Sequence, residues 1–222
     1  MKDVLLLHGA LGCNAHWNHI LPYLDKSFTY HNLNFPLHGR AASPKKDLQL
    51  RDLSDFISGY VSAQRLDEFT IMGYSMGGYA GIDLAIRHQE GLVKVITLGT
   101  KLNWSPRVAE EEISRISLEG LKPIHEKLEK EHGNAWRDVV YATHSIMKGI
   151  GENPIKKEDM AAIAIPVHLL VGEKDKMVTA EETKAFAESG HTITWEVVPM
   201  QPHLLERVDA GLIAKRINSL LD

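Results

Sequence analysis

The chain has 222 residues, 44% of them hydrophobic, and a formal net charge of −4 at pH 7. This composition predicts a folded domain with a substantial core, and 25 basic against 29 acidic side chains leave no basic excess for a phosphate backbone. We therefore expect no nucleic-acid partner. Cys13 is the single cysteine and no leader-like segment precedes the first apolar run, so the sequence predicts a cytoplasmic protein. The apolar runs are too short to predict a membrane span.

The first expected strand is the continuous apolar run from Val4 to Leu7, which is typical of a strand buried on both faces of a parallel sheet. It stops at His8-Gly9-Ala10-Leu11-Gly12. Two glycines after a buried strand allow the backbone to approach a neighbouring site, so the amide of Ala10 is a candidate donor to a ligand. A plain turn between strand and loop is the alternative interpretation of this segment.

The next elements alternate between strand and helix. Residues 28–33 form a second expected strand, which is followed by a loop marked by proline and glycine over residues 34–40. Apolar residues at helical spacing over 53–61 predict a crossover helix, and further strands are expected over 69–72 and 93–98. This alternation predicts right-handed crossovers and a parallel sheet covered on both faces.

A serine stands at the turn between the strand over 69–72 and the helix that follows. Gly73 and Gly77 lie two positions before and two positions after Ser75, as a strained turn that exposes the serine hydroxyl requires. In such a turn the amide of Met76 and the positive end of the following helix point toward whatever the serine attacks. The alternative is that Ser75 only caps the helix.

The alternation breaks between about Lys101 and Ala164, where no strong strand pattern occurs. Acidic and lysine-rich stretches there predict surface helices, which we interpret as a helical cap of residues 101–164 inserted into a core of residues 1–100 and 165–222. Because both ends of this insertion leave the sheet near Ser75, the cap is expected to lie over that edge. Trp104 and Trp136 are its candidate substrate-binding residues, and the loops that hold Leu11 and Leu37 are the other candidates.

The strand pattern resumes over residues 167–171 and again over 193–198, and an apolar stripe over 208–221 predicts a last helix. Asp175 follows the first of these strands and His203 follows the second. An activated serine needs a base, and the base needs an acid that fixes its tautomer. Because loops at the carboxyl ends of parallel strands share one edge of the sheet, Ser75, Asp175 and His203 are candidate partners in that order.

Taken together, these motifs resemble the α/β-hydrolase superfamily. The resemblance is carried by the loop from His8 to Gly12 with Trp17, the turn from Gly73 to Gly78, the stretch from Gly172 to Asp175 and His203 behind Pro202. It implies an α/β-hydrolase fold, with a mostly parallel sheet of about six strands flanked by helices and a small helical cap. One departure is Asn34, where such proteins often carry aspartate, and it leaves the hydrogen bonding of the loop that follows open.

The resemblance also implies a site and a chemistry. Ser75 is the expected nucleophile, His203 the base and Asp175 the acid, which the family spacing favours over Glu173. The amides of Ala10 and Met76 form the expected oxyanion hole, and no metal or organic cofactor is implied.

The leading functional interpretation is hydrolysis of a small acyl ester through an acyl-enzyme. Thioesterase, amidase, cofactor-free haloperoxidase, carbon–carbon hydrolase and menaquinone-pathway lyase activities remain open. So does a slow-turnover small-molecule binding protein, because function depends on the pocket and not on the fold.

Overall fold

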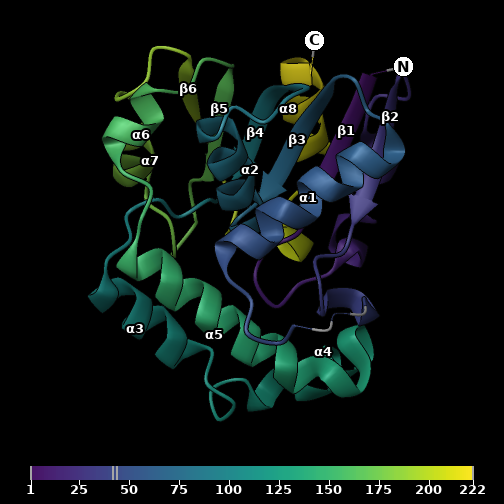
Figure 1. Cartoon of the computed structure of the whole chain (residues 1–222), viewed down its shortest axis with the longest axis vertical. Helices are drawn as coiled ribbons and strands as arrows, with labels where there is room; N and C mark the ends of the chain where they lie inside the picture. The colour runs from purple at the N-terminus through teal and green to yellow at the C-terminus, as the bar shows by residue number, and fades with distance from the viewer. Residues whose placement is uncertain (1, 42, 44, 222) are drawn as a thin grey trace.

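The computed structural model describes residues 2–41, 43 and 45–221 of the chain. Six strands form one parallel sheet in the order β2-β1-β3-β4-β5-β6 (Figure 1). This arrangement confirms the predicted fold class. The strands are β1 (Lys2–Leu7), β2 (Phe28–Leu33), β3 (Phe69–Tyr74), β4 (Leu92–Leu98), β5 (Val167–Gly172) and β6 (Ile193–Val198).

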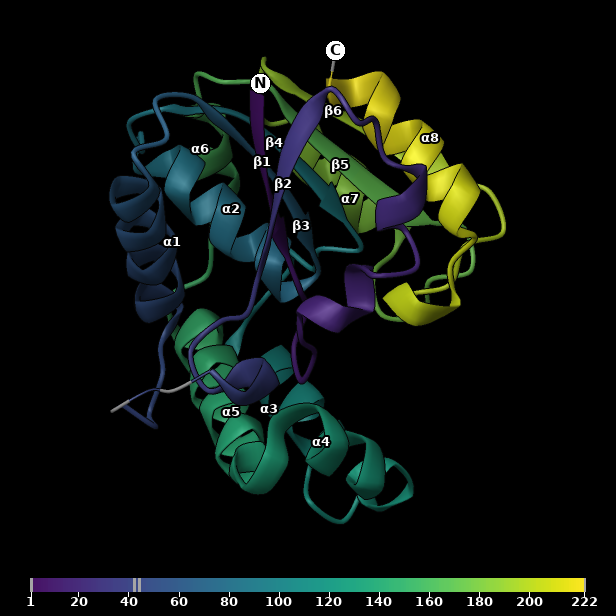
Figure 2. The same cartoon turned by 90° about the vertical axis from the view of Figure 1, so that its right-hand side faces the viewer.

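The continuous apolar strands are buried because helices cover both faces of the sheet. In β1, Leu5 and Leu7 pack into the core on one face, whereas Val4 and Leu6 pack into the core on the other, and all four are fully buried. Figure 2 shows α1 and α2 on the first face and α8 on the second. The flanking helices are α1 (Leu50–Gln64), α2 (Met76–Ile86), α6 (Lys157–Ala161), α7 (Ala180–Ala187) and α8 (Ala210–Leu221).

Between β4 and β5 the chain forms a group of helices at the carboxyl ends of the strands, opposite the two termini (Figure 1). Ser105 caps the first of them, since its hydroxyl accepts a hydrogen bond from Val108 N at 3.2 Å. The short helix α6 packs beside α7 instead. The division into a core and a cap of residues 101–164 stays a prediction. The grouped helices are α3 (Pro106–Arg115), α4 (His125–His132) and α5 (Trp136–Glu152).

Short 3₁₀ turns complete the connections: η1 (Asn14–Trp17), η2 (Leu21–Tyr23), η3 (His38–Arg40), η4 (Lys122–Ile124), η5 (Gly133–Ala135) and η6 (Leu205–Arg207). Among the helices of the described residues, none combines the length and the apolar character that crossing a membrane requires.

Candidate active site

Ser75 lies at the sharp turn between β3 and α2 with φ 49° and ψ −114°, a strained conformation for a residue with a side chain. The two flanking glycines are a steric requirement of this turn. A Cβ atom on Gly73 would lie 2.4 Å from the nitrogen of Gly78, and one on Gly77 would lie 2.7 Å from the carbonyl oxygen of His8. The local sequence therefore dictates the turn that the glycine spacing predicts.

The Ser75 backbone is held firmly while its side chain is left facing a cavity. Ser75 N donates to the carbonyl of Leu98 at 2.9 Å, and the Thr100 hydroxyl donates to the carbonyl of Ser75 at 3.0 Å. Among the described residues, the Ser75 side chain makes no capping hydrogen bond to α2. Ser75 thus occupies the N-cap position of α2 without a capping bond from its side chain, and its role as a nucleophile stays a prediction.

His203 and Asp175 meet at the same edge of the sheet. Nδ1 of His203 donates to Oδ2 of Asp175 at 2.7 Å, and the carboxylate is only 1% exposed. Oδ1 of Asp175 accepts from the backbone amides of Met177 and Val178 at 2.7 and 2.9 Å. With both oxygens occupied, the carboxylate is fixed in place, and the His203 ring is oriented by it with Nε2 available to the cavity.

Gly99 permits this pair to form, although the sequence gives no hint of its role. It follows β4 with φ 62°, and a Cβ atom there would lie 3.1 Å from Oδ2 of Asp175 and 3.2 Å from Nδ1 of His203. Its positive φ and its contact distances both favour glycine. The Tyr74 ring also packs against the His203 ring, with their centroids 5.4 Å apart.

The loop after β1 lies against the serine. A Cβ atom on Gly9 would lie 3.2 Å from Cβ of Ser75, and Gly12 N donates to the carbonyl of Gly9 at 3.1 Å, which closes a tight turn around Ala10. Ala10 and Met76 both line the small cavity that Ser75 faces. The two residues predicted to supply oxyanion donors thus line the same cavity as Ser75.

Two buried histidines hold this loop from either side. His8 Nδ1 donates to the carbonyl of Gly9 at 2.8 Å while its Nε2 accepts from Phe35 N at 3.1 Å. His132, at the end of α4, donates from Nε2 to the carbonyl of Leu11 at 3.1 Å and accepts from Gly39 N at Nδ1. Burial is the main cause that lowers the pKa of both rings, so both are neutral near pH 7.

Two cavities open at Ser75, a large one of about 320 Å³ and a small one of about 40 Å³. Trp104 lines both cavities, and Leu11 lines the large one. Leu37 is buried at a separate surface hollow near His132. Trp136 is buried in the cluster with Leu121 and Leu128, and its ring contacts that of His125 at a tilt of 43°. Of the four predicted substrate-binding residues, Leu37 and Trp136 are therefore not among the described residues that line the Ser75 cavities.

Comparison with known proteins agrees with this geometry. The model of the alpha/beta hydrolase family matches residues 4–209, which is most of the chain. This chain belongs to the α/β-hydrolase family.

Relatives and solved structures of this hydrolase are distant. It is 20% identical to a pyrrolizixenacetamide deacetylase of Xenorhabdus hominickii, over 96% of this chain and 68% of that protein. It is 30% identical to a pimeloyl-[acyl-carrier protein] methyl ester esterase of Aromatoleum aromaticum, over 44% of this chain and only 37% of that one. A thermophilic esterase from Thermogutta terrifontis superposes with a TM-score of 0.83 at 20% identity, covering 100% of this chain and 89% of that one.

Two further predictions concern single side chains of this α/β-hydrolase. Asn34, where related proteins often have aspartate, accepts from Asn14 N at 2.7 Å and donates to the carbonyl of Gly39 at 3.4 Å. An aspartate could not make the second bond, so the amide ties the two loops together. Glu173 accepts from Met200 N at 2.8 Å and is exposed, so it forms no part of the His203 pair.

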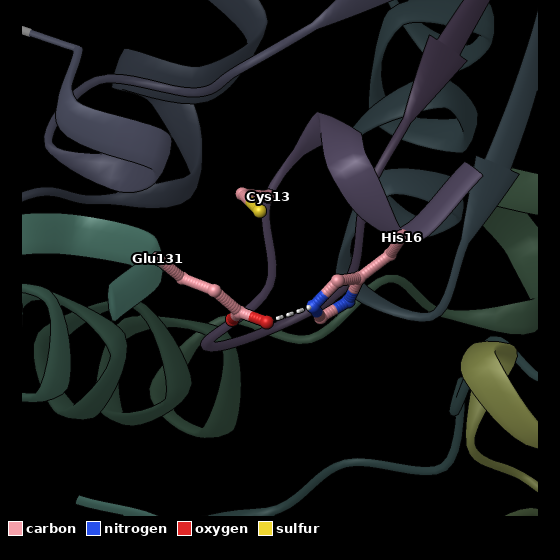
Figure 3. A group of neighbouring side chains, drawn as sticks. All are labelled: Cys13, His16 and Glu131. Atoms are coloured by element: carbon pink, nitrogen blue, oxygen red, sulfur yellow. Dashed lines mark hydrogen bonds and ion pairs between the residues drawn. The ribbon is translucent and has the colours of Figure 1, made fainter. Parts of the chain in front are cut away.

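Cys13, His16 and Glu131 form the one group among the described residues with the donor types of a metal site, and their ligand atoms lie within 4.8 Å of one another (Figure 3). However, His16 Nε2 and Glu131 Oε1 are already hydrogen-bonded at 3.1 Å, and the ammonium of Lys127 lies 3.8 Å from the same oxygen. Burial also raises the pKa of the Cys13 thiol, whereas metal binding needs the thiolate. We therefore interpret this group as a link between η1 and α4.

Proposed function

We propose that this protein is a serine hydrolase that cleaves small acyl esters through an acyl-enzyme. The observation that carries the proposal is the hydrogen bond of 2.7 Å between His203 and the buried Asp175, at a cavity that Ser75 also lines. A carboxylate that fixes a histidine beside a serine on a strained turn is the arrangement that activates a hydroxyl for attack on a carbonyl.

In the first half-reaction, Oγ of Ser75 attacks the carbonyl carbon of the ester and His203 Nε2 takes the hydroxyl proton. The imidazolium that forms is stabilised by Asp175, whose carboxylate accepts a hydrogen bond from Nδ1–H and stays ionised. The tetrahedral intermediate collapses when the C–O bond to the alcohol breaks, and His203 returns the proton to the departing oxygen. The acyl group is then bonded to Ser75.

The negative charge on the carbonyl oxygen needs donors that are already in place. The amides of Ala10 and Met76 are our candidates, because the loop after β1 and the first turn of α2 flank Ser75. Loss of one donor of this kind reduces kcat by roughly 10²- to 10³-fold in serine hydrolases. In the second half-reaction, water enters where the alcohol was, and His203 removes its proton as the water oxygen attacks the acyl carbon. The bond between that carbon and Oγ of Ser75 then breaks, His203 returns the proton to Oγ, and the carboxylic acid leaves.

The comparisons support the ester class without restricting the substrate. The thermophilic esterase and the methyl ester esterase are named for ester hydrolysis, and the relative aligned over 96% of this chain is named a deacetylase. Thioesters and amides would follow the same two half-reactions. The partner we propose is a small-molecule acyl substrate, no cofactor is required by these steps, and a cytoplasmic location stays a prediction from the sequence.

A fluorophosphonate probe tests the proposal, because it bonds only to an activated hydroxyl that faces oxyanion donors. We expect the purified protein to be labelled on Ser75, as read by peptide mass spectrometry, and Ser75→Ala to lose both the label and ester turnover by at least ~10³-fold. A slow-turnover binding protein would be labelled but would not show rapid multiple turnover. Full ester turnover in Ser75→Ala would overturn the proposal.

A further inference from the structure

The two cavities at Ser75 differ in size and in their relation to the histidine. The large cavity, of about 320 Å³, is lined by His203, whereas the small cavity, of about 40 Å³, is lined by Met76 and Tyr79 of α2. His203 is not among the described residues that line the small cavity. The residues common to both are Ala10, Ser75, Lys101, Trp104 and Met147.

We propose that the small cavity is the acyl subsite and that the large cavity binds the alcohol, so that the enzyme selects esters of short acyl groups with bulky, apolar alcohols. This inference rests on the proposed function. His203 must deliver a proton to the alcohol oxygen as the C–O bond breaks, so the alcohol has to lie on the His203 side of Ser75. The acyl group, on the other side of the carbonyl carbon, is left with the small cavity.

The volume of the small cavity sets the length of the acyl group. A water-sized probe needs about 10–15 Å³, and a cavity of about 150 Å³ holds benzene. At about 40 Å³ the small cavity has room for a few heavy atoms and not for an aromatic ring. It therefore fits an acetyl to butanoyl group, and a hexanoyl chain would have to displace Ile146 or Ile150, which are buried in the core.

The chemistry of the lining makes this subsite apolar, because its polar atoms are bound elsewhere. The Tyr79 hydroxyl accepts from Ile155 N at 2.8 Å, and Trp104 Nε1 donates to the carbonyl of Lys101 at 2.8 Å. The Lys101 ammonium donates to the carbonyl of Met177 at 3.0 Å and lies 3.8 Å from Glu112. The Tyr79 hydroxyl and the Trp104 ring nitrogen are therefore already paired, and an unsubstituted alkyl chain suits the part of the lining that they form.

The large cavity has room for a much bulkier group than the small cavity. At about 320 Å³ it is about twice the volume that holds benzene, and much of its wall is aliphatic. Many of its apolar side chains come from the segment between β4 and β5, and Leu204 adds another beside His203. An aryl or similarly bulky alcohol would bury its surface there. The side chains from the segment between β4 and β5 include Ile116, Leu121, Ile124, Leu128 and Met147.

A matrix of esters tests the proposal on the wild-type protein. Acetate, butanoate, hexanoate and octanoate are each offered as the phenyl and the 2-naphthyl ester, whose alcohols leave with similar ease. We expect kcat/KM to fall by at least ~10-fold from butanoate to octanoate, and 2-naphthyl acetate to be cleaved at least as well as phenyl acetate. A kcat/KM that stays level or rises with acyl length, or a marked preference for phenyl over 2-naphthyl acetate, would overturn the assignment.

A matched pair of variants separates the two Ser75 cavities. Of these two, Ile150 lines the small one and not the large one, and Ile124 lines the large one and not the small one. Ile150→Ala should raise relative kcat/KM for hexanoate by roughly 10- to 200-fold, the range for a pocket change of this size. Ile124→Ala should leave the acyl-length profile unchanged. Ile150→Val serves if the alanine variant unfolds. The reverse ranking of the two positions would place the acyl group in the large cavity.

The labelling result distinguishes the two possible failures. If Ser75 reacts with the fluorophosphonate and esters turn over, but long acyl groups are preferred, only the subsite assignment is wrong. If Ser75 is not labelled and no ester turns over, the proposed function fails and the subsite assignment fails with it.

Discussion

Asp175 uses its two carboxylate oxygens for different tasks. Oδ1 accepts the amides of Met177 and Val178 and so shapes the loop after β5, whereas Oδ2 accepts the proton on Nδ1 of His203. An asparagine could keep the loop bonds through its carbonyl oxygen. Its NH₂ group would then face Nδ1 of His203, where a proton acceptor is needed, and would favour the imidazole tautomer that cannot take the Ser75 proton.

We therefore expect Asp175→Asn to lower kcat by about 10⁴-fold without unfolding the protein, the scale measured for such a change in a serine protease triad. Stopped-flow or steady-state ester hydrolysis gives kcat, and thermal unfolding checks the fold. The control is Glu173→Gln, two residues away, whose carboxylate accepts only from Met200 N in an exposed position. A large loss of kcat in Glu173→Gln, with little loss in Asp175→Asn, would show that the acid is misplaced.

At the scale of single residues, the sequence predicts those roles that depend on spacing along the chain. Gly73 and Gly77 could be predicted because their steric role lies within one turn, and Asp175 and His203 because each follows a strand at the same edge. Gly99 could not be predicted, since its role exists only where three separate loops meet. The exclusion of Trp136 from the cavity lining likewise depends on which side of α5 packs against Leu128.

At the scale of elements, helix α4 is hydrogen-bonded to the loop after β1 through His132. His132 is 1% exposed and joins the loop after β1, through Leu11, to η3, through Gly39. Leu11 has φ 55° and directly follows Ala10. The bond to Leu11 holds the carbonyl of the Leu11–Gly12 peptide, two peptide units after the one that carries the proposed Ala10 donor. This bond makes His132 our candidate positioning residue, contributed by an element outside the sheet.

Two substitutions of His132 separate its two bonds. The amide nitrogen of glutamine falls near Nε2 and can keep the bond to Leu11, whereas asparagine places its oxygen near Nδ1 and can keep only the bond from Gly39. We expect kcat to fall by about 10-fold more in His132→Asn than in His132→Gln, less than the loss of an oxyanion donor itself.

The rate of Ser75 labelling should follow the same order as kcat, while the two variants share a similar unfolding temperature. His125→Gln, in the same helix, is the control, since its ring bonds to the carbonyl of Leu118. Equal activity of the two His132 variants would show that the bond to Leu11 does not position the donor.

Helices and strands could be predicted where the hydrophobic pattern of the chain is strong. The position of a helix in the fold was harder to predict, because it depends on tertiary packing. The alternating strands and helices gave the sheet correctly because buried parallel strands are continuous apolar runs. The helices between β4 and β5 were expected as one group, yet α6 packs beside α7 because Met160 and Ile163 join the same core as Phe186. No local pattern distinguishes an apolar side chain that faces the cap from one that faces the core.

At the scale of the whole molecule, three buried imidazoles connect the sheet edge to α4. The rings of His8 and His38 have centroids 4.9 Å apart, and those of His38 and His132 are 5.8 Å apart. Burial is the main cause that lowers the pKa of all three, to about 4 for His38. His38 donates from Nδ1 to the carbonyl of Pro36, and its Nε2 has no hydrogen-bond partner among the described residues. A proton on Nε2 would therefore be buried without an acceptor.

The lowered pKa values of these histidines predict that the folded protein becomes less stable as the pH falls. The unfolded chain binds a proton on His38 near pH 6.5, whereas the folded chain does so only near pH 4. The contribution of His38 to the free energy of unfolding is thus complete above about pH 6.5 and is lost as the pH falls toward 4. This loss amounts to ~3 kcal/mol for His38 alone. His8 and His132 act in the same direction. The free energy of unfolding in urea, measured from pH 7.5 to 4.5, should fall accordingly.

His38→Asn tests whether this ring is responsible, because its side-chain amide can still donate to Pro36 but does not titrate. The variant should have a shallower dependence of unfolding free energy on pH, even if it is less stable at pH 7.5. The control is His191→Asn, at an exposed position, which should keep the wild-type slope. The carboxylates of Glu131 and Glu206 lie against the nearby His16, and this pairing can add its own pH dependence. Salt screens such charge interactions, so the pH dependence of the unfolding free energy should also be measured at high salt. A slope that is unchanged in His38→Asn at both salt concentrations would assign the acid instability to other groups.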